Sequence, residues 1–293
     1  MTIETETPKN ISTGIRPLPI GHSPDPDDAF MFYGFGAKLV TIPGFEIDHV
    51  LDDIQSLNVR AMQGELPVTA ISAHAYPYVA DKYWIMKTGA SMGEGYGPII
   101  VSKKYRTMEE LEANPDAVIA QPGKLTTANL LLRTWFGQIK SVEMDFDKII
   151  DAVLDGTVDA GLLIHEGQIT WDQYGLNKLA DFGVIWEEKT GGLPLPLGLD
   201  CVRKDMGETT ARAISQALRD SIKCAYDNEQ DSVEYALQWG RGIDHATGAR
   251  FVKMYVNDVT MDMGERGKQA LEFLFRIGAE SGIIPQVGEI ELY

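Results

Sequence analysis

The chain has 293 residues, of which 44% are hydrophobic and 24% are charged, a composition that excludes disordered and collagen-like proteins. This length allows one large core or two lobes of roughly 100–200 residues each. The 26 basic and 43 acidic side chains give a net charge of −17. We therefore expect no nucleic-acid partner, because neutralising phosphates requires a basic stripe and the sequence shows none.

The sequence also limits the location of the protein. The longest apolar runs, at 96–101 and 160–164, fall far short of the roughly 20 residues that a membrane span requires, so we expect no membrane partner. Residues 1–10 lack the basic start and apolar stretch of a secretory signal, which indicates a cytoplasmic protein, although a mature exported form would look the same. Cys201 and Cys224 are too few for a disulfide framework, and we expect both to be structural. A monomer and a homodimer both remain open.

Short apolar strands alternate with helices along the first part of the chain. We predict strands at 17–21, 45–51 and 67–71, and helices at 29–35, at 54–62 and from Ser72 through Tyr83. Ser72 is expected to be the N-cap of the third helix. The glycine-rich segment 89–97 and the apolar run 97–101 then predict a crossing to a second unit.

The second unit repeats this order. We predict strands at 117–120 and 158–164, a helix opened by Thr126 and Thr127, and a helix at 146–155 closed by Gly156. The proline-rich segment 191–199 predicts a return crossing into a strand at 200–203, and long helical patterns follow at 209–239 and 264–282. The pattern therefore predicts an α/β fold with one lobe at 15–101 and 200–293, a second lobe at 102–199, and a ligand cleft between them.

Three predicted helix starts lie at the carboxyl ends of strands, where α/β proteins bind ligands. They follow Ser23, begin at Ser72, and begin at Thr126 and Thr127. Each offers unpaired backbone N–H groups, a hydroxyl and a positive dipole end, which together would bind a small carboxylate or another anion. The alternative, that these residues only cap their helices, stays open.

His165 follows the buried strand at 158–164 and has Glu166 beside it. A neutral imidazole removes protons near pH 7 without a metal, so His165 is a candidate general base and Glu166 a candidate for orienting it. A hydrogen-bonded structural histidine is the alternative, and His74 has the same ambiguity. Aromatic residues near His165 in sequence would suit an aromatic substrate, or pack in the core: Trp171, Tyr174 and Trp186.

Cofactor motifs are incomplete, so we predict neither a cofactor nor a metal. The Gly93 to Gly97 segment lacks the third glycine of a dinucleotide site, and Gly123-Lys124 lacks the rest of a P-loop. Position 169 is Ile169, so the second histidine of a zinc-protease motif is missing. Five acidic residues could suggest a metal site: Asp25, Asp27, Asp28, Asp52 and Asp53. Of these, Asp27-Asp28 and Asp52-Asp53 are better explained as helix-start residues.

Several blocks, taken in order, resemble the 1,4-dihydroxy-6-naphthoate synthase family of the futalosine route to menaquinone. They are Ser23-Pro24 with Asp28 and Phe30-Met31-Phe32, the segment 64–69 before Ser72, Gly95-Tyr96-Gly97-Pro98, Pro122-Gly123 with Thr126-Thr127-Ala128, and the segments 161–166, 191–198, 255–257 and 264–265.

The resemblance implies a type II periplasmic-binding-protein-like fold, with two small mixed sheets flanked by helices, used as a cytoplasmic lyase. It implies conversion of cyclic de-hypoxanthinyl futalosine, a small anionic aromatic substrate, to 1,4-dihydroxy-6-naphthoate with release of a three-carbon fragment. The resemblance assigns proton abstraction to His165. It assigns substrate binding to Ala70, Ile71 and Ser72 and to Thr127 and Ala128, beside Ser23 and Thr126 from the helix-start argument.

Two departures from the family pattern make the site less positive. Asp25-Pro26-Asp27-Asp28 stands where the family usually has Cys-Pro-Asn-Asp, and Ala70 stands where it usually has lysine. Lys87 and Lys124 are candidates for replacing the lost charge, which an anionic substrate would feel. Two alternatives stay open: a non-catalytic protein that binds a small carboxylate, and a relative such as chorismate dehydratase. The His-Glu block favours the synthase.

Overall fold

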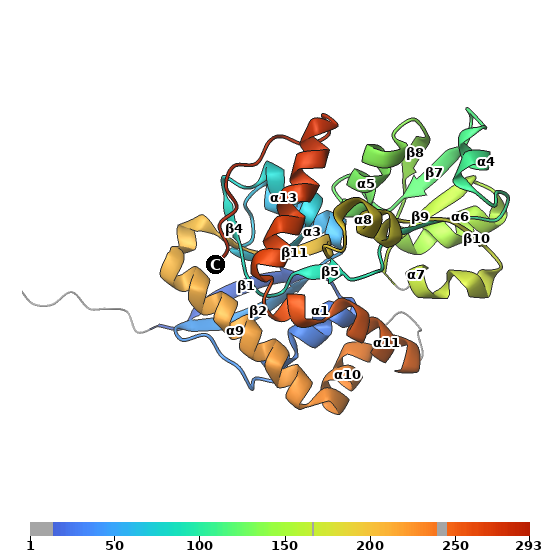
Figure 1. The fold of residues 1–293 in the computed structure, drawn as a ribbon. Coiled ribbons are helices and arrows are strands. Elements are labelled where there is room, and N and C mark those ends of the chain that lie inside the picture. The colour runs from blue at the N-terminus through green and yellow to red at the C-terminus, as the bar shows by residue number, and fades with distance from the viewer. Residues whose placement is uncertain (1–13, 166, 239–244) are drawn as a thin grey trace, which may run out of the picture.

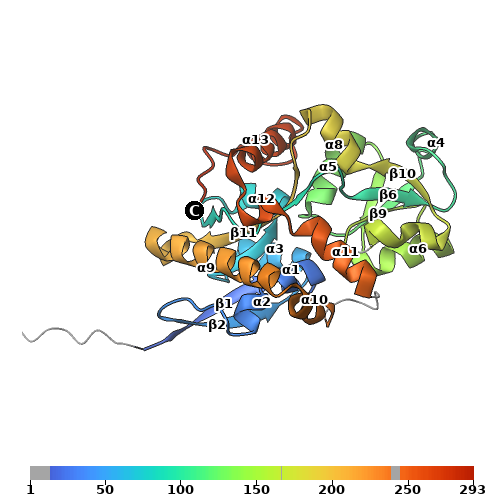
Figure 2. The same cartoon turned by 60° about the horizontal axis from the view of Figure 1, so that its bottom comes forward.

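The computed structural model describes residues 14–165, 167–238 and 245–293, which form two sheets side by side, each with helices around it (Figures 1 and 2). The first sheet has the order β2-β1-β3-β11-β4, and β5 also pairs with β11. Its strands come from both ends of the described chain: β1 (Arg16–His22), β2 (Phe45–Leu51), β3 (Val68–Ser72), β4 (Tyr83–Ile85), β5 (Ser91–Gly93) and β11 (Leu195–Arg203).

The second sheet is formed by the middle of the chain and has the order β10-β6-β9-β7-β8. Its strands are β6 (Ile99–Ser102), β7 (Val118–Gln121), β8 (Lys140–Glu143), β9 (Ala160–Leu163) and β10 (Asn177–Asp181). In each sheet, parallel strands combine with antiparallel ones: β1 is parallel to β2 and β3, and β7 is parallel to β8 and β9. The predicted α/β fold with two small mixed sheets is confirmed.

Helices connect and cover the strands of both sheets. The helices are α1 (Pro26–Met31), α2 (Tyr33–Gly36), α3 (Ile54–Met62), α4 (Met108–Glu112), α5 (Thr127–Phe136), α6 (Ile149–Asp155), α7 (Gly167–Thr170), α8 (Phe182–Thr190), α9 (Glu208–Asp227), α10 (Glu229–Leu237), α11 (His245–Tyr255), α12 (Asp258–Met261) and α13 (Gly264–Glu280), with 3₁₀ turns η1 (Ala73–Tyr78), η2 (Phe146–Lys148), η3 (Trp171–Tyr174) and η4 (Lys204–Met206). No helix of the described part has both the length and the apolar character needed to cross a membrane.

The two lobes share a buried apolar core. One cluster of buried side chains includes Ile71 of β3 and Leu274 of α13 on the first side, and Leu131 of α5 and Leu162 of β9 on the second. Helices α5 and α13 contact each other where the lobes meet. Because apolar burial is the main favourable term in folding, this shared cluster holds the lobes together at one end of the cleft.

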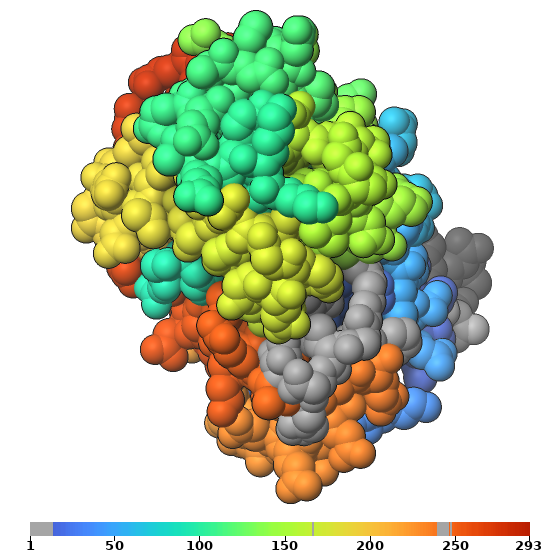
Figure 3. All heavy atoms as spheres, turned by 90° about the vertical axis from the view of Figure 1, so that its right-hand side faces the viewer, coloured from blue at the N-terminus to red at the C-terminus, as the bar shows by residue number. Residues whose placement is uncertain are grey.

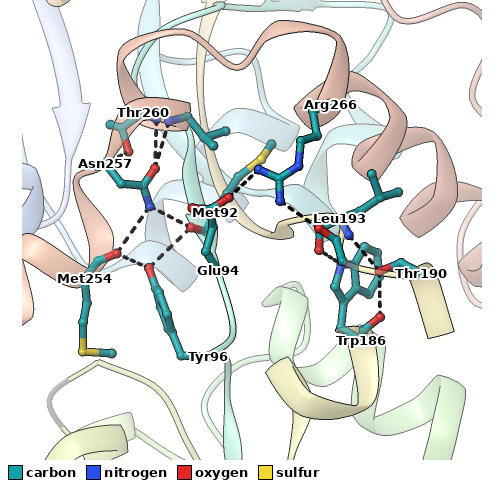
Figure 4. A network of polar contacts seen from close by, with 12 residues as sticks. Met92, Glu94, Tyr96, Trp186, Thr190, Leu193, Met254, Asn257, Thr260 and Arg266 are labelled. Atoms are coloured by element: carbon teal, nitrogen blue, oxygen red, sulfur yellow. Dashed lines mark hydrogen bonds and ion pairs between the residues drawn. The ribbon is translucent and has the colours of Figure 1, made fainter. Parts of the chain in front are cut away.

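A polar network fixes the two crossings between the lobes (Figure 4). Arg266 of α13 donates to Glu94 Oε1 on the first crossing at 2.6 Å and to the carbonyl of Gly192 on the second at 2.8 Å. The Tyr96 hydroxyl on the first crossing donates to the carbonyl of Met254 in α11. One arginine therefore ties both crossings to the same helix, beside the cleft that they border.

Two sequence predictions of local structure are wrong, and a third is right in place but not in length. The predicted helix from Ser72 through Tyr83 is only the 3₁₀ turn η1, which contains Pro77, and Tyr83 begins β4. The single helix predicted at 209–239 breaks at Asn228, whose backbone is not helical (φ −125°, ψ 46°). The return crossing predicted at 191–199 is shorter than expected, because β11 already begins at Leu195 and the strand predicted at 200–203 is only its second part.

The sheet pairing places the lobe boundaries a few residues from their predicted positions. Strand β6 lies wholly in the second sheet and β11 wholly in the first, whereas the predicted boundaries cut through both strands. We propose boundaries between β5 and β6 and between α8 and β11.

Candidate active site

A pocket of about 720 Å³, including space that is open to solvent, lies between the two lobes at the carboxyl ends of β1, β3 and β9. This is the place where α/β sheets bind ligands, because several loops and helix starts converge there. All eight residues singled out from the sequence line it: Ser23, Ala70, Ile71, Ser72, Thr126, Thr127, Ala128 and His165. The strand-end and helix-start argument supplied Ser23, Ser72, Thr126, Thr127 and His165, and the family resemblance supplied Ala70, Ile71 and Ala128.

The first lobe contributes Ser72, which is positioned by Asn58 of α3. The Asn58 Oδ1 accepts from the backbone N–H of Ser72 at 2.7 Å, and its Nδ2 donates to Ser72 Oγ at 3.0 Å. Ser72 precedes η1 but makes no side-chain capping bond, so its predicted role as a helix cap is wrong. Because its oxygen already accepts from Asn58, the Ser72 hydroxyl is left with its own proton to donate.

The second lobe contributes the start of α5. Thr126 caps this helix as predicted, with its Oγ1 accepting from the backbone N–H of Asn129 at 3.2 Å. Thr127 instead connects the lobes: its hydroxyl donates to the carbonyl of Leu197 at 2.7 Å and accepts from the backbone N–H of His74 at 3.2 Å. The positive end of the α5 dipole therefore faces the pocket.

His165 reaches the pocket from the loop after β9. Its backbone has φ +55°, a left-handed conformation that is costly for a side chain with a Cβ and is found where a site over-determines it. The ring Nδ1 lies 3.2 Å from Asp25 Oδ2, and the ring centroid lies 4.7 Å from that of Phe146. The same Asp25 oxygen accepts from the Ser23 hydroxyl at 2.8 Å.

One wall of the pocket is acidic. Burial, followed by the charges of Asp28 and Asp25, raises the pKa of Asp27 well above its usual range. Burial also raises the pKa of Asp28 to about 6, although the backbone N–H of Ser23 donates to Asp28 at 2.6 Å and so opposes the shift. Burial, with a smaller effect of the Asp28 charge, likewise raises the pKa of Asp200 in β11. Desolvation favours the neutral acid at each position.

The predicted interpretation of the aspartates as helix-start residues is incomplete. Asp27 and Asp28 do lie in the first turn of α1, but they are buried and line the pocket. Asp53, in contrast, caps α3 as expected, with its side chain accepting from the backbone N–H groups of Gln55 and Ser56. No three His, Cys, Asp or Glu side chains within the described ranges are grouped to hold a metal ion.

The compensating lysines expected from the sequence do not reach the pocket. Lys87 is exposed, and Lys124 pairs with Glu143 on the surface at 3.5 Å. The described residues that line the pocket include no lysine or arginine. The prediction that either lysine replaces the lost charge is therefore wrong, and polar contacts to an anion must come from hydroxyls, N–H groups, His165 and neutral acids.

Comparison with known proteins identifies the family. Residues 18–280 match the sequence model of a family described as menaquinone biosynthesis. The chain belongs to this family. It is 36% identical over 266 residues to a 1,4-dihydroxy-6-naphtoate synthase of Thermus thermophilus, covering 91% of this chain and 95% of that protein. It is 36% identical over 281 residues to the protein of that name from Streptomyces coelicolor, covering 92% and 96%.

Solved structures agree with the fold. A crystal structure from Archaeoglobus fulgidus has a TM-score of 0.87 at 44% identity and covers 94% of this chain and 100% of that chain. An alkanesulfonate-binding protein of Xanthomonas axonopodis bound to MOPS has a TM-score of 0.66 at 14% identity and covers 93% and 96%. The second likeness shows that this member of the menaquinone-biosynthesis family has the periplasmic-binding-protein fold.

The aromatic residues near His165 in sequence, and the second candidate histidine, do not line the pocket. Trp186 is buried in the core, as one of the two interpretations expected, and Tyr174 is 48% exposed. The described pocket lining includes neither of these two residues nor Trp171. His74 Nδ1 contacts the carbonyl of Thr126 at 3.0 Å, and burial lowers its pKa to about 4, which indicates a structural role. Glu166 lies outside the described residues.

The sequence analysis missed several polar residues of the pocket, among them Gln168, Asp200 and Tyr255. Gln168 of α7 bonds the hydroxyl of Tyr255 in α11, which brings the second lobe against the C-terminal helices (Figure 3). Asp200 also lines the pocket, and its Oδ1 is buried without a hydrogen-bond partner among the residues that the structure describes. The sequence did contain a signal for Asp200. A carboxylate between Leu199 and Cys201 in a buried strand costs stability, which points to a functional reason for its position.

Proposed function

We propose that this protein is a carbon–carbon lyase of menaquinone biosynthesis that converts cyclic de-hypoxanthinyl futalosine to 1,4-dihydroxy-6-naphthoate, with His165 as the general base. The observation that carries the proposal is that His165 and the seven other residues singled out from the sequence line one pocket between the lobes. The names of two relatives that align over more than nine-tenths of the chain support the reaction. The proposal includes two expectations from the sequence, namely that the protein is cytoplasmic and that it needs no cofactor.

The pocket suggests how each end of the substrate is held. The carboxylate of the substrate would lie between the donating hydroxyl of Ser72 and the start of α5, where the helix dipole favours negative charge. The reacting ring would then lie towards His165. This arrangement requires no lysine at position 70, because Ala70 is 8% exposed and contributes only apolar surface.

In the proposed reaction, His165 removes a proton from a carbon of the bound substrate. The electron pair left on carbon forms a new carbon–carbon double bond to the adjacent carbon, and the bond from that carbon to the three-carbon fragment breaks. The fragment leaves with the bonding pair and takes back the proton from His165, while the remaining ring becomes aromatic. A positioned base of this kind contributes about 10²–10⁴-fold to a rate. Only 16% of the His165 side chain is exposed, which limits the access of water to the base.

Mass spectrometry of purified protein incubated with cyclic de-hypoxanthinyl futalosine tests this proposal. We expect the naphthoate to form, and His165→Ala to abolish turnover while the ligand still raises the melting temperature. His49→Gln is a matched control, because His49 contacts His22 and does not line the pocket. An active His165→Ala variant would show that another group is the base.

A binding protein without catalysis is the second candidate, since solved neighbours of the same fold include ligand-binding components of transporters. This candidate predicts no product but tight binding of another small carboxylate. The chorismate dehydratase alternative fits the pocket less well. Chorismate carries two carboxylates, and the described lining offers four aspartates and no lysine or arginine to meet them.

A further inference from the structure

The imidazole of His165 is held by a group from the opposite lobe. Asp25 lies in the first lobe, at the residue that precedes α1, whereas His165 follows β9 of the second lobe. Their side chains meet at 3.2 Å between Asp25 Oδ2 and His165 Nδ1, with 4% and 16% of the side chains exposed. A contact this short and this well shielded from water constrains the ring far more than a surface pair does.

Asp25 is itself fixed by its own loop. The Ser23 hydroxyl donates to Asp25 Oδ2 at 2.8 Å, and the backbone N–H of Asp25 donates back to Ser23 Oγ at 3.1 Å. The two residues thus form a closed pair of hydrogen bonds that holds the carboxylate in place. The oxygen that faces His165 is therefore positioned before the imidazole reaches it.

The backbone of His165 is also supported from the cleft. In the amide orientation of Gln168 that satisfies its neighbours, the oxygen accepts from the backbone N–H of His165 at 3.2 Å and the nitrogen donates to the carbonyl of Gly97 at 2.7 Å. The ring of Phe146 packs on the imidazole. These contacts fix the left-handed backbone and one side of the ring, and leave Asp25 to determine which nitrogen carries the proton.

We propose that Asp25 is a positioning residue for His165, supplied across the cleft by the opposite lobe. An acceptor at Nδ1 selects the tautomer with the proton on that nitrogen, so the lone pair of Nε2 is free to take the substrate proton. After the transfer, the carboxylate stabilises the imidazolium. Because the two residues belong to different lobes, the base is oriented when the lobes are together.

The inference rests on the proposed function for its kinetic part, but its first test does not. Nitrogen-15 NMR of the neutral histidine side chains reports the tautomer directly, and the signal of His165 among the five histidines is assigned by its loss in His165→Ala. We expect a dominant Nδ1–H form in the wild-type protein. Asp25→Ala should shift His165 towards the Nε2–H form that a free imidazole prefers.

Kinetics provides the second test. We expect Asp25→Ala to lower kcat about 10- to 100-fold with a smaller change in KM. A positioned base raises the rate about 10²–10⁴-fold, and part of this gain is lost when the imidazole is no longer oriented. Asp25→Asn keeps an acceptor oxygen and should recover part of the rate. Ser23→Ala loosens the carboxylate and should fall between wild type and Asp25→Ala. Asp172→Ala, which removes an exposed carboxylate outside the pocket, is the matched control and should leave the tautomer and kcat unchanged.

The possible results separate the two proposals. If Asp25→Ala folds but keeps both the Nδ1–H form and the wild-type kcat, the positioning role is wrong. If it loses rate with no change of tautomer, Asp25 acts in some other way and the inference also fails. If the wild-type protein gives no naphthoate, the proposed function fails, while the NMR comparison still decides whether Asp25 sets the tautomer.

Discussion

The buried carboxyl of Asp28 should make this protein less stable as the pH rises, and Asp28→Asn should remove that effect. Burial is the largest cause that raises the Asp28 pKa from 3.8 to about 6. In the unfolded chain the group has its ordinary value, so the folded state binds the proton more tightly. The stabilising contribution is therefore fully present below about pH 3.8 and is lost as the pH rises through about 6.

The expected magnitude follows from the two values. A rise of the Asp28 pKa from 3.8 to about 6 corresponds to about 3 kcal/mol of unfolding free energy, at about 1.4 kcal/mol per pKa unit. Asparagine has no charge to desolvate, and its amide oxygen can still accept from the backbone N–H of Ser23, which donates to Asp28 at 2.6 Å in the wild type. Asp28→Asn should therefore stabilise the protein by about 3 kcal/mol at pH 8 and by little at pH 4.

Thermal unfolding followed by intrinsic fluorescence between pH 4 and pH 8 measures this difference. At about 2 °C per kcal/mol for a chain of this size, the melting temperature of Asp28→Asn should exceed that of the wild type by about 6 °C at pH 8. Asp172→Asn, which removes an exposed carboxylate, should follow the wild type throughout. A difference between Asp28→Asn and wild type that is the same at pH 4 and pH 8, or a less stable variant at pH 8, would refute the reasoning.

Two further substitutions test the packing around the pocket and the crossings. Gly89 has φ +93°, and a Cβ there would lie 2.0 Å from Asp200 Oδ2, so Gly89→Ala should cost about 3 kcal/mol or more. Gly44→Ala, with φ +81° and nothing within 4 Å, should cost only the backbone strain of about 1 kcal/mol, and equal losses in thermal unfolding would contradict this account. Arg266→Ala should cost about 1 kcal/mol, because its ion pair is partly exposed, yet raise KM by freeing both crossings. Arg276→Ala on the same helix is the control. An unchanged KM in Arg266→Ala would show that the bonds of Arg266 to the two crossings do not shape the pocket.

The pocket could be located from the sequence because its residues follow a local rule. Thr126, Ser72 and His165 each stand where an apolar run ends, and parallel strands bring such ends to one edge of a sheet. The helix cap at Thr126 is equally local and was predicted correctly. The capping role of Ser72 was wrong because Asn58, distant in sequence, competes for the same hydroxyl.

The contacts that tune the pocket could not be predicted in this way. Asp25 and His165 lie in different lobes, and nothing in the spacing of either residue indicates that their side chains meet. Tyr255 reaches the pocket from α11, a helix that the predicted elements did not include. Such pairs depend on how the lobes pack, which is set by the shared core around α5 and α13 and not by local periodicity.

The proposed function places an anion in the pocket of a chain with a net charge of −17, and the acidic wall bears on how the two are compatible. Long-range repulsion between exposed charges is screened within about 10 Å at moderate salt, so the groups in the pocket dominate. Burial raises the pKa of Asp27, Asp28 and Asp200, which favours neutral acids, and a neutral acid donates a hydrogen bond where an ionised one repels. Keeping Asp28 buried lowers stability above about pH 6, a cost that proteins retain where activity needs it. The acids that oppose folding are thus the same groups that, when protonated, make the pocket compatible with a carboxylate.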